Sequence, residues 1–218
     1  MGISVGMRRL GAALVVSLIA ATSLAAQTTA APEPARLSPE EQILISQIED
    51  YLNGITTVEA GFVQMSAQGQ YAKGKLYLQR PGRMRFEYEP PFPYLLVADG
   101  TWFIYVDQEL EQVTYLPLGK TPAGLLLRKD FSFSEGLVVT GIEARPSSVR
   151  VDVVDSRRPE AGRVSLTLAR KPLSLKSWTV HDAQGQRIQV TLIDPRYGAP
   201  LDKSLFRFIN RFERRPER

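Results

Sequence analysis

The chain has 218 residues, of which 44% are hydrophobic and 23% charged, and its formal net charge is +4. This length allows one domain or two small ones, and the composition excludes both wholesale disorder and a membrane protein with many spans. Cysteine is absent and His181 is the single histidine. Disulfides, thiolate metal sites, cysteine nucleophiles and an acylated cysteine are therefore excluded, and a zinc site or a histidine-based triad would depend on that one residue.

The first 26 residues have the pattern of a secretory signal peptide. Arg8 and Arg9 precede an apolar run over 10–21, and small residues follow at 23–26. The run is short for a membrane span, so we expect cleavage near residue 25 or 26 and an exported mature chain, with an uncleaved anchor as the alternative. Cleavage removes two positive charges, and the weak basicity that is left does not favour nucleic-acid binding.

A helix is predicted after a leader at 27–37, which is rich in proline and small residues and which we interpret as flexible. Ser38 suits the N-cap position, Pro39 the first helical position, and Glu41 can complete a capping box. Apolar residues then recur at helical spacing, and Gly54 can end the helix. These apolar residues are Leu44, Ile48, Tyr51, Leu52 and Ile55. We expect one face of this helix to be buried.

After the helix, eleven short runs rich in β-branched and aromatic residues are separated by turn residues. Their approximate ranges are 56–66, 71–80, 83–89, 94–98, 101–107, 111–116, 137–144, 148–155, 163–169, 174–182 and 186–194. The connections are short, as in the expected hairpin turn at Gln184 and Gly185, and short connections predict antiparallel neighbours because parallel strands need crossovers of about a dozen residues. One domain over 38–212, followed by a basic tail at 213–218, accounts for this pattern.

The longest connection, residues 117–136, joins the sixth and seventh predicted strands. Thr121 and Pro122 can begin a short helix, and three leucines follow at 125–127. Three consecutive leucines are not expected to face one core. Two interpretations remain open, namely a helix tucked under the edge of the sheet and an apolar flap over a cavity.

The alternation of the second and third predicted strands raises a question about Arg80. Arg80 shares its parity with Leu76 and Leu78, and Met84 and Phe86 form a matching apolar stripe on the next strand. A buried guanidinium is costly unless its donors are paired. Either the stripe faces outward and Arg80 is solvated, or carbonyl or carboxylate partners hold Arg80 inside. Periodicity by itself favours the outward-facing stripe.

Catalytic motifs are not found in the sequence, which contains no G-x-S-x-G, H-E-x-x-H or phosphate-loop pattern. His181 stands beside Asp182 at a predicted turn, where a surface histidine is the ordinary interpretation. Glu87 and Glu89 alternate with apolar residues and are expected on an outer face. We therefore predict no catalytic residue, no metal site and no cofactor.

The residues LYLQRPGRMRFEY at 76–88 resemble the hallmark segment of the periplasmic outer-membrane lipoprotein carrier proteins, the LolA family. The resemblance continues through LVADG at 96–100, TPAGLLL at 121–127 and LDKSLFRF at 201–208. These motifs follow one another in the family's order, and together the resemblance covers about 42–210.

The resemblance implies a mainly β (α+β) fold. The expected architecture is a single curved antiparallel sheet that forms an unclosed half-barrel of about eleven strands, lidded by the N-terminal helix and by short helices in the 117–136 connection. It also implies a periplasmic chaperone that binds acylated lipoproteins released by an inner-membrane ATP-driven complex. The cargo would pass to an outer-membrane receptor or to the outer membrane itself, and the carrier is expected to be a monomer that binds no nucleic acid.

In the family, the arginine that matches Arg80 hydrogen-bonds to the lid backbone and keeps the empty carrier closed. The resemblance therefore reverses the preference from periodicity, and we expect Arg80 to point inward, toward carbonyls of 125–127 or of the first helix. Met84 stands where an aromatic residue is common in the family. The residues expected to line the acyl-binding cavity are Leu76, Leu78, Met84, Phe86 and Ile104, and the lid and gating residues are Arg80, Leu125 and Leu126.

Parity does not settle the strands at 94–98 and 101–107, because both of their faces are apolar. Either Trp102 and Ile104 or Phe103 and Tyr105 could line the cavity. The alternative function is a plain periplasmic lipid- or protein-binding module with the same fold, for example an envelope-stress sensor. Such sensors carry a second domain, for which this chain is expected to be too short.

Overall fold

The structure of the protein is a computed structural model that describes residues 32–181 and 186–212. These residues form the helices α1 (Pro39–Gly54) and α2 (Pro122–Leu126) and the short 3-10 helices η1 (Leu118–Lys120), η2 (Pro159–Ala161) and η3 (Lys203–Phe206). The strands are β1 (Thr57–Ser66), β2 (Tyr71–Gln79), β3 (Arg83–Tyr88), β4 (Tyr94–Asp99), β5 (Trp102–Asp107), β6 (Gln112–Pro117), β7 (Leu137–Ala144), β8 (Ser148–Asp155), β9 (Arg163–Arg170), β10 (Leu173–His181) and β11 (Arg187–Tyr197). The predicted signal peptide, residues 27–31 of the leader, the turn at Gln184 and Gly185, and the basic tail lie outside the described residues.

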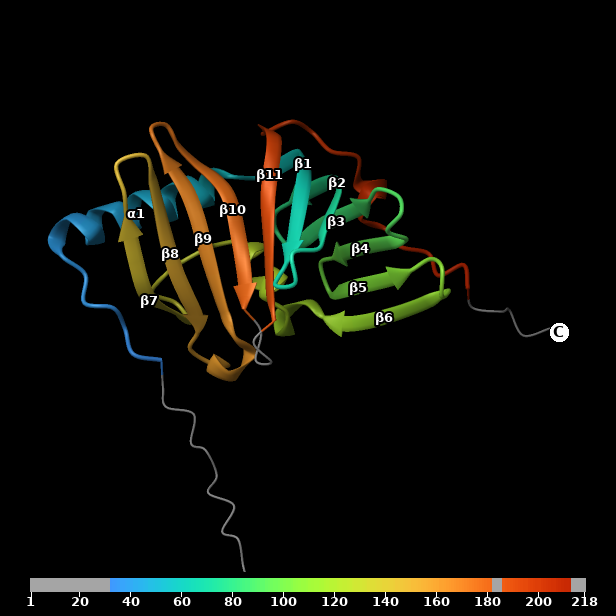
Figure 1. Cartoon of the computed structure of the whole chain (residues 1–218), viewed down its shortest axis with the longest axis horizontal. Helices are drawn as coiled ribbons and strands as arrows, with labels where there is room; N and C mark the ends of the chain where they lie inside the picture. Colours follow the sequence, from blue (N-terminus) through green and yellow to red (C-terminus); the bar gives the residue numbers. More distant parts are fainter. Residues whose placement is uncertain (1–31, 182–185, 213–218) are drawn as a thin grey trace, which may run out of the picture.

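The eleven strands form one antiparallel sheet in the order β6-β5-β4-β3-β2-β1-β11-β10-β9-β8-β7. β6 and β7 are the two edges, so the sheet is not closed, and Figure 1 shows it curving around α1 and the connection between β6 and β7. The predicted class, a mainly β half-barrel of eleven antiparallel strands, is confirmed. In the part of the chain that the structure describes, no helix is long and apolar enough to cross a membrane.

Helix α1 forms as its capping signals predict. The Ser38 backbone N–H donates to the Glu41 carboxylate at 2.8 Å, and the Glu41 N–H donates to the Ser38 hydroxyl at 3.3 Å, which completes the capping box. Before the helix, the Ala35 N–H donates to the Val139 carbonyl on edge strand β7 at 2.8 Å, so the last part of the predicted flexible leader is attached to the sheet. The buried side chains of the helix are Leu44, Ile48 and Leu52.

Two separate clusters of buried residues lie on the two faces of the sheet. The main cluster fills the concave face, between the sheet on one side and α1, η1 and α2 on the other. The second cluster is formed by Val97, Ile104 and Val106 of β4 and β5, against which Phe208 and Phe212 of the C-terminal segment pack. Arg85 on β3 helps to hold that segment by donating to the Leu205 carbonyl at 3.1 Å.

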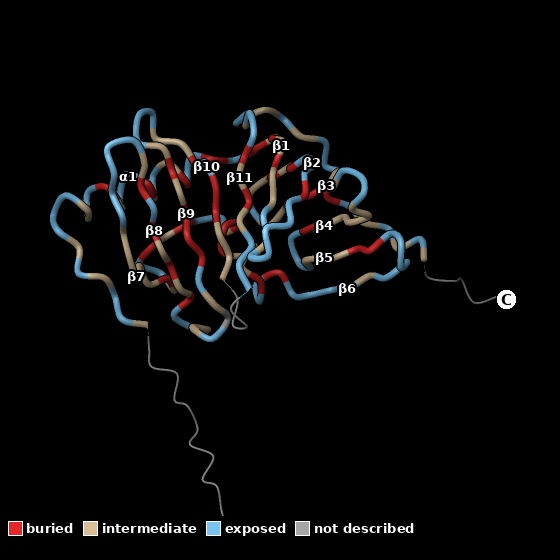
Figure 2. Tube along the Cα trace, viewed as in Figure 1, coloured by how far each residue is buried: buried red, intermediate tan, exposed pale blue. Residues whose placement is uncertain are grey.

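The concave face itself divides into two parts (Figure 2). Its covered half is the inner side of β8 and β9 beneath α1, where Val149, Val151, Leu166 and Leu168 are fully buried. Its open wing is the inner side of β4, β5 and β6. Ala98 and Asp107 on this side are buried. The other members of the open wing are half-buried or exposed and include Tyr94, Leu96, Phe103, Tyr105, Thr114 and Leu116.

Candidate functional site

The apolar stripe of the second and third strands lies on the concave face. Leu76 is paired across the strands with Phe86, and Leu78 with Met84, and all four side chains are less than a tenth exposed. Leu125 and Leu126 of α2 belong to the same buried cluster. The structure therefore brings together four of the five predicted cavity residues and both predicted lid leucines, in a state where the protein covers its own apolar face.

Ile104 does not join them. It lies on the opposite face of β5, in the second cluster with Val97 and Val106, beneath the C-terminal segment. Phe103 packs against the main cluster instead, and Tyr105 is paired with Leu96 on the concave side. Both faces of β5 are apolar because both are covered, one by the concave cluster and the other by the C-terminal segment, and for that reason parity did not identify the inner one.

Two aromatic residues of the concave face were not predicted as site residues. Phe62 of β1 lies edge-on to Phe86, with ring centroids 4.9 Å apart, and Trp178 of β10 lies edge-on to Phe86 at 6.3 Å. The alternation of β1 would have indicated Phe62, because Val58 and Ala60 share its parity. For Trp178 the alternation breaks, since the pairing of β10 with β9 shifts register between Leu175 and Ser177.

Arg80 points inward and contacts the first helix. Its Nη1 donates to the carbonyl oxygen of Leu52, near the C-terminal end of α1, at 2.5 Å. The other predicted partner of Arg80 was the backbone at 125–127. There the Leu127 carbonyl accepts a hydrogen bond from the backbone N–H of Gly82, two residues after Arg80, at 2.9 Å. The segment that follows β2 therefore contacts both parts of the lid, α1 through a side chain and the α2 region through the backbone.

The hydrogen-bond donors of the Arg80 guanidinium group are only partly satisfied. The Nε atom of Arg80 is buried and has no hydrogen-bond partner among the described residues. Burial lowers the pKa of the guanidinium to about 10, so the group is still charged at neutral pH. A charge-assisted hydrogen bond contributes about 1.5 to 3 kcal/mol, and a buried unpaired donor costs about 1 to 3 kcal/mol. The closed state is therefore held by a contact whose net stabilisation is small.

Polar side chains of α1 also hold the segment that follows α2. The Asn53 amide makes two hydrogen bonds with the backbone of Phe131, donating to its carbonyl at 2.9 Å and accepting from its N–H at 2.8 Å. The Glu49 carboxylate accepts from the Phe133 N–H at 2.7 Å. The two phenylalanine rings are buried edge-on to each other. These contacts join α1 and residues 131–133 into one unit, which the sequence did not predict.

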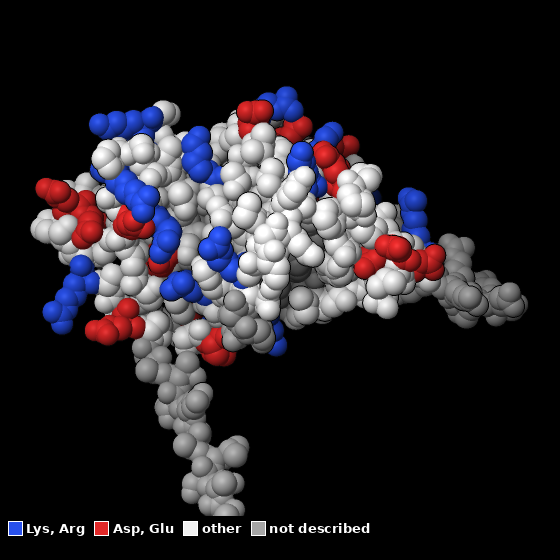
Figure 3. All heavy atoms as spheres, in the orientation of Figure 1, with Lys and Arg blue, Asp and Glu red and all other residues white. Residues whose placement is uncertain are grey.

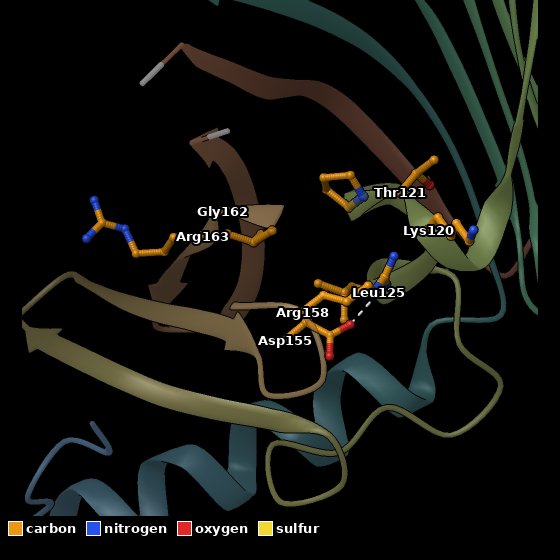
Figure 4. A pocket seen from close by; sticks show the side chains of 9 residues that line it. Lys120, Thr121, Leu125, Asp155, Arg158, Gly162 and Arg163 are labelled. Carbon is orange, nitrogen blue, oxygen red and sulfur yellow. Dashed lines mark hydrogen bonds and ion pairs between the residues drawn. The ribbon is translucent and has the colours of Figure 1, made fainter. Parts of the chain in front are cut away.

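A further contact holds the start of the connection. Arg158 donates to the Gly119 carbonyl at 2.6 Å. It also donates to the carboxylate of Asp155 at 3.0 Å, and Figure 4 shows these two side chains. Burial opposes ionisation of Asp155, but hydrogen bonds from Arg157 and Arg158 and the nearby cationic groups hold the pKa of its carboxyl below the usual value. Arg158 therefore contacts the backbone of the lid.

The three consecutive leucines are all buried in the main cluster, contrary to the expectation that they could not share one core. Thr121 caps α2 by accepting from the Gly124 N–H, as predicted, and α2 ends at Leu126. Because the helix is short and ends there, the backbone at Leu127 changes direction and its side chain also turns inward. The connection that bears these leucines runs from one edge strand to the other, beneath the concave face.

The outer face of β8 to β11 bears basic side chains, and Figure 3 shows lysine and arginine gathered over β8, β9 and β10. His181 is paired across the strands with Arg163 on one side and Arg187 on the other. Burial and these neighbouring positive charges lower the pKa of His181, although Asp152 opposes the shift. Within residues 32–181 and 186–212, no group of three or more histidine and acidic side chains is arranged to hold a metal ion.

An apolar concave sheet closed by its own lid defines a lidded half-barrel. Residues 53–209 match the family model of the outer membrane lipoprotein carrier protein LolA, and the chain belongs to this family. It is 27% identical to an outer-membrane lipoprotein carrier protein of Methylococcus capsulatus over 75% of this chain and 82% of that one. It is 26% identical to the protein of the same name from Cupriavidus necator, over 78% and 86%. A solved LolA superfamily protein from Nitrosomonas europaea superposes with a TM-score of 0.46 at 9% identity, over 75% and 97%.

Proposed function

We propose that the protein is a periplasmic carrier that takes acylated lipoproteins from an inner-membrane ATP-driven complex and delivers them to an outer-membrane receptor or to the outer membrane itself. The acyl chains occupy the concave face, against Leu76, Leu78, Met84 and Phe86. Leu125 and Leu126 are the lid contacts, and Arg80 is the gating residue. The carrier performs no reaction and needs no cofactor.

The lid over the concave face is the observation that carries this proposal. An acyl chain in water exposes apolar surface equivalent to about 0.8 kcal/mol for each CH₂ group, so a carrier must offer a comparably large apolar surface. An empty carrier with that surface exposed would aggregate. In this protein the same surface is covered by α1 and α2, whose side chains belong to the same buried cluster as the stripe.

Release requires that cargo is not held too tightly. Lipid entry has to displace the lid and break the hydrogen bond from Arg80 to the Leu52 carbonyl. Breaking that bond subtracts from the free energy gained by acyl burial, so the affinity for cargo is reduced by the cost of opening. A carrier with this competition binds cargo with intermediate affinity, which suits transfer to a membrane acceptor.

The test is release of lipoprotein from spheroplasts. Spheroplasts incubated with the mature protein should yield a soluble complex of the protein with an acylated lipoprotein, identified by mass spectrometry of the bound chain. A Phe86→Glu variant, which puts a charge on the apolar stripe, should release far less. Folded native protein that releases no lipoprotein would contradict the carrier function and would favour a plain binding module of the same fold.

A further inference from the structure

Three tyrosines lie together on the concave face, at the ends of β3, β4 and β5 farthest from Arg80. Tyr88 is edge-on to Tyr94, with ring centroids 5.9 Å apart, and Tyr94 is stacked at a tilt on Tyr105 at 5.6 Å. Tyr88 continues the stripe of Met84 and Phe86, since alternate residues of β3 share a face. The three tyrosines therefore form one end of the surface on which the acyl chains are proposed to lie.

Further polar side chains stand next to the tyrosines. The Tyr88 hydroxyl donates to the amide oxygen of Gln64 on β1 at 2.6 Å. Ser66, two residues further along the same face of β1, has a buried hydroxyl without a hydrogen-bond partner among the described residues. The ring of Phe62 lies edge-on to both Phe86 and Tyr88, with ring centroids 4.9 and 5.1 Å away, and so joins this group to the stripe. It packs on the backbone of Gly74, where an added Cβ would lie 2.6 Å from the phenylalanine ring.

The group is polar but carries no cation. Within the bounds of strands β1 to β6, no lysine or arginine occupies a concave position, and Arg80 lies just beyond β2 at the opposite end. The one acid on this side of β5, Asp107, uses its carboxylate to accept from the backbone N–H groups of Glu109 and Leu110. Burial, and then the neighbouring Tyr94 and Asp107, raise the pKa of Tyr105 to about 12, and a side-chain hydrogen bond joins Tyr105 to Tyr94.

This chemistry selects among the parts of a lipid. A phosphate or carboxylate head group would find no positive charge here, and a bare hydrocarbon chain would gain nothing from hydroxyl groups. Ester and amide carbonyls are neutral acceptors, and they stand where the acyl chains join the glyceryl-cysteine of an acylated lipoprotein. In the empty protein the hydroxyl groups pair with Gln64 and with one another, and on cargo binding they can turn to donate to such carbonyls instead. Hydroxyl groups at one end of an apolar surface match this division into tails and carbonyl groups.

We infer that Tyr88, Tyr94 and Tyr105, with Gln64, form a subsite for the ester and amide carbonyls of the acylated cysteine. The tails extend from this subsite along the stripe toward the lid. The inference rests on the proposed function, because it specifies which end of the cargo lies at which end of the concave face. It also makes the binding face selective for acyl esters over other apolar molecules of the same length.

The test compares two synthetic probes. One is a palmitoylated S-glyceryl-cysteine lipopeptide with ester-linked tails, and the other is the same lipopeptide with ether-linked alkyl tails, which lack the ester carbonyls. The chain has two tryptophans, so a Trp102→Phe background leaves Trp178, which lies against Phe86, as a single fluorescence reporter of binding. The test variant replaces Tyr88, Tyr94 and Tyr105 with phenylalanine, and the matched control is Tyr115→Phe, whose side chain is on the outer side of β6.

The native protein should bind the ester probe more tightly than the ether probe, by about fivefold for each hydroxyl that is used. The triple variant should lose this preference through weaker ester binding while its affinity for the ether probe stays within about twofold. Equal affinities of the native protein for both probes would overturn the subsite and leave the carrier function standing. Equal losses for both probes in the triple variant would show that the tyrosines only pack, which also overturns it. No binding of either probe by folded protein would overturn the carrier function, and the subsite with it.

Discussion

The covered half and the open wing of the concave face differ both in their side chains, which are aliphatic in the covered half and largely aromatic in the open wing, and in their burial. In the covered half, Leu166 and Leu168 of β9 are fully buried beneath α1. In the open wing, Phe103 is half-buried and Leu116 is 45% exposed, although both also belong to the concave side of the sheet. The covered half is therefore part of the hydrophobic core, and the open wing is a partly exposed surface of aromatic, aliphatic and hydroxyl-bearing side chains.

The difference indicates how a carrier can be stable and still accept cargo. A core that opened completely would lose most of the stabilisation of the fold, because each buried leucine contributes about 1.5 to 3 kcal/mol. Under the proposed function, a wing that remains partly exposed would offer a first contact for an acyl chain before the lid moves. The contacts of Arg80 with α1, and of Asn53 in α1 with Phe131, would then determine how far the chain can enter.

The largest effect is expected when a leucine is replaced by alanine, because the loss in the free energy of unfolding should differ between the covered half and the open wing. Leu166→Ala should lower the free energy of unfolding by about 3 kcal/mol, because it leaves a cavity in a site without solvent access. Leu116→Ala, the same substitution in the open wing, should lower it by less than about 1 kcal/mol and weaken lipopeptide binding instead. Urea unfolding and Trp178 fluorescence titrations measure the two quantities. Equal losses of stability would show that the wing is also part of the core.

The next effect concerns the hydrogen bond from Arg80 to the Leu52 carbonyl of α1. Arg80→Leu should still bind acylated lipoprotein, with an affinity that rises by about tenfold at most, because the hydrogen bond that opening no longer breaks is partly offset by the buried unpaired Nε. Transfer to outer-membrane vesicles should then be slow. The matched control is Arg83→Leu on the outer side of β3, where the side chain contacts Gln79. If Arg80→Leu passed on its cargo as fast as the native protein, Arg80 would have no gating role.

A smaller effect is expected where α1 holds the segment after α2. Asn53→Ala removes two neutral hydrogen bonds with the backbone of Phe131 and should lower the free energy of unfolding by about 2 kcal/mol. Hydrogen exchange at the Phe131 amide should accelerate, since the lid opens more often. Gln47→Ala, at an exposed position of the same helix, is the control. Unchanged exchange in the Asn53 variant would mean that the segment is held by its buried rings alone.

The smallest effect is expected on the outer face of the covered half. The pKa of His181 is lowered in the folded protein by burial and by Arg163, Arg187 and Arg150, with Asp152 opposing. The unfolded chain therefore binds a proton more readily, and this site should lower stability as the pH falls through and below 6.5, the ordinary pKa of histidine. His181→Gln should flatten the dependence of the unfolding free energy between about pH 7 and pH 5. Identical slopes for the two proteins would contradict the shift.

Local patterns predicted most of the elements because their causes are local. The capping box of Ser38 and Glu41 and the N-cap at Thr121 use contacts within three residues, and both are present in the structure. The eleven strands were predicted from residue type and turns, within a few residues at most of their ends. Ile104 is an exception because a distant segment, which contains Phe208, covers it. Leu127 is an exception of another kind, since its direction depends on where the short helix α2 ends.

The sequence by itself determined which residues share a face of each strand, because alternation with a period of two is a property of the extended backbone. It placed Arg80 with Leu76 and Leu78, but periodicity did not tell which face was inside. Which face lies inside was decided by the packing of α1 on one face and of the C-terminal segment on the other. The tertiary structure also decided that the Leu52 carbonyl is the partner of Arg80. These contacts join residues far apart in the chain, and their free energy depends on the curvature of the whole sheet, which no local pattern contains.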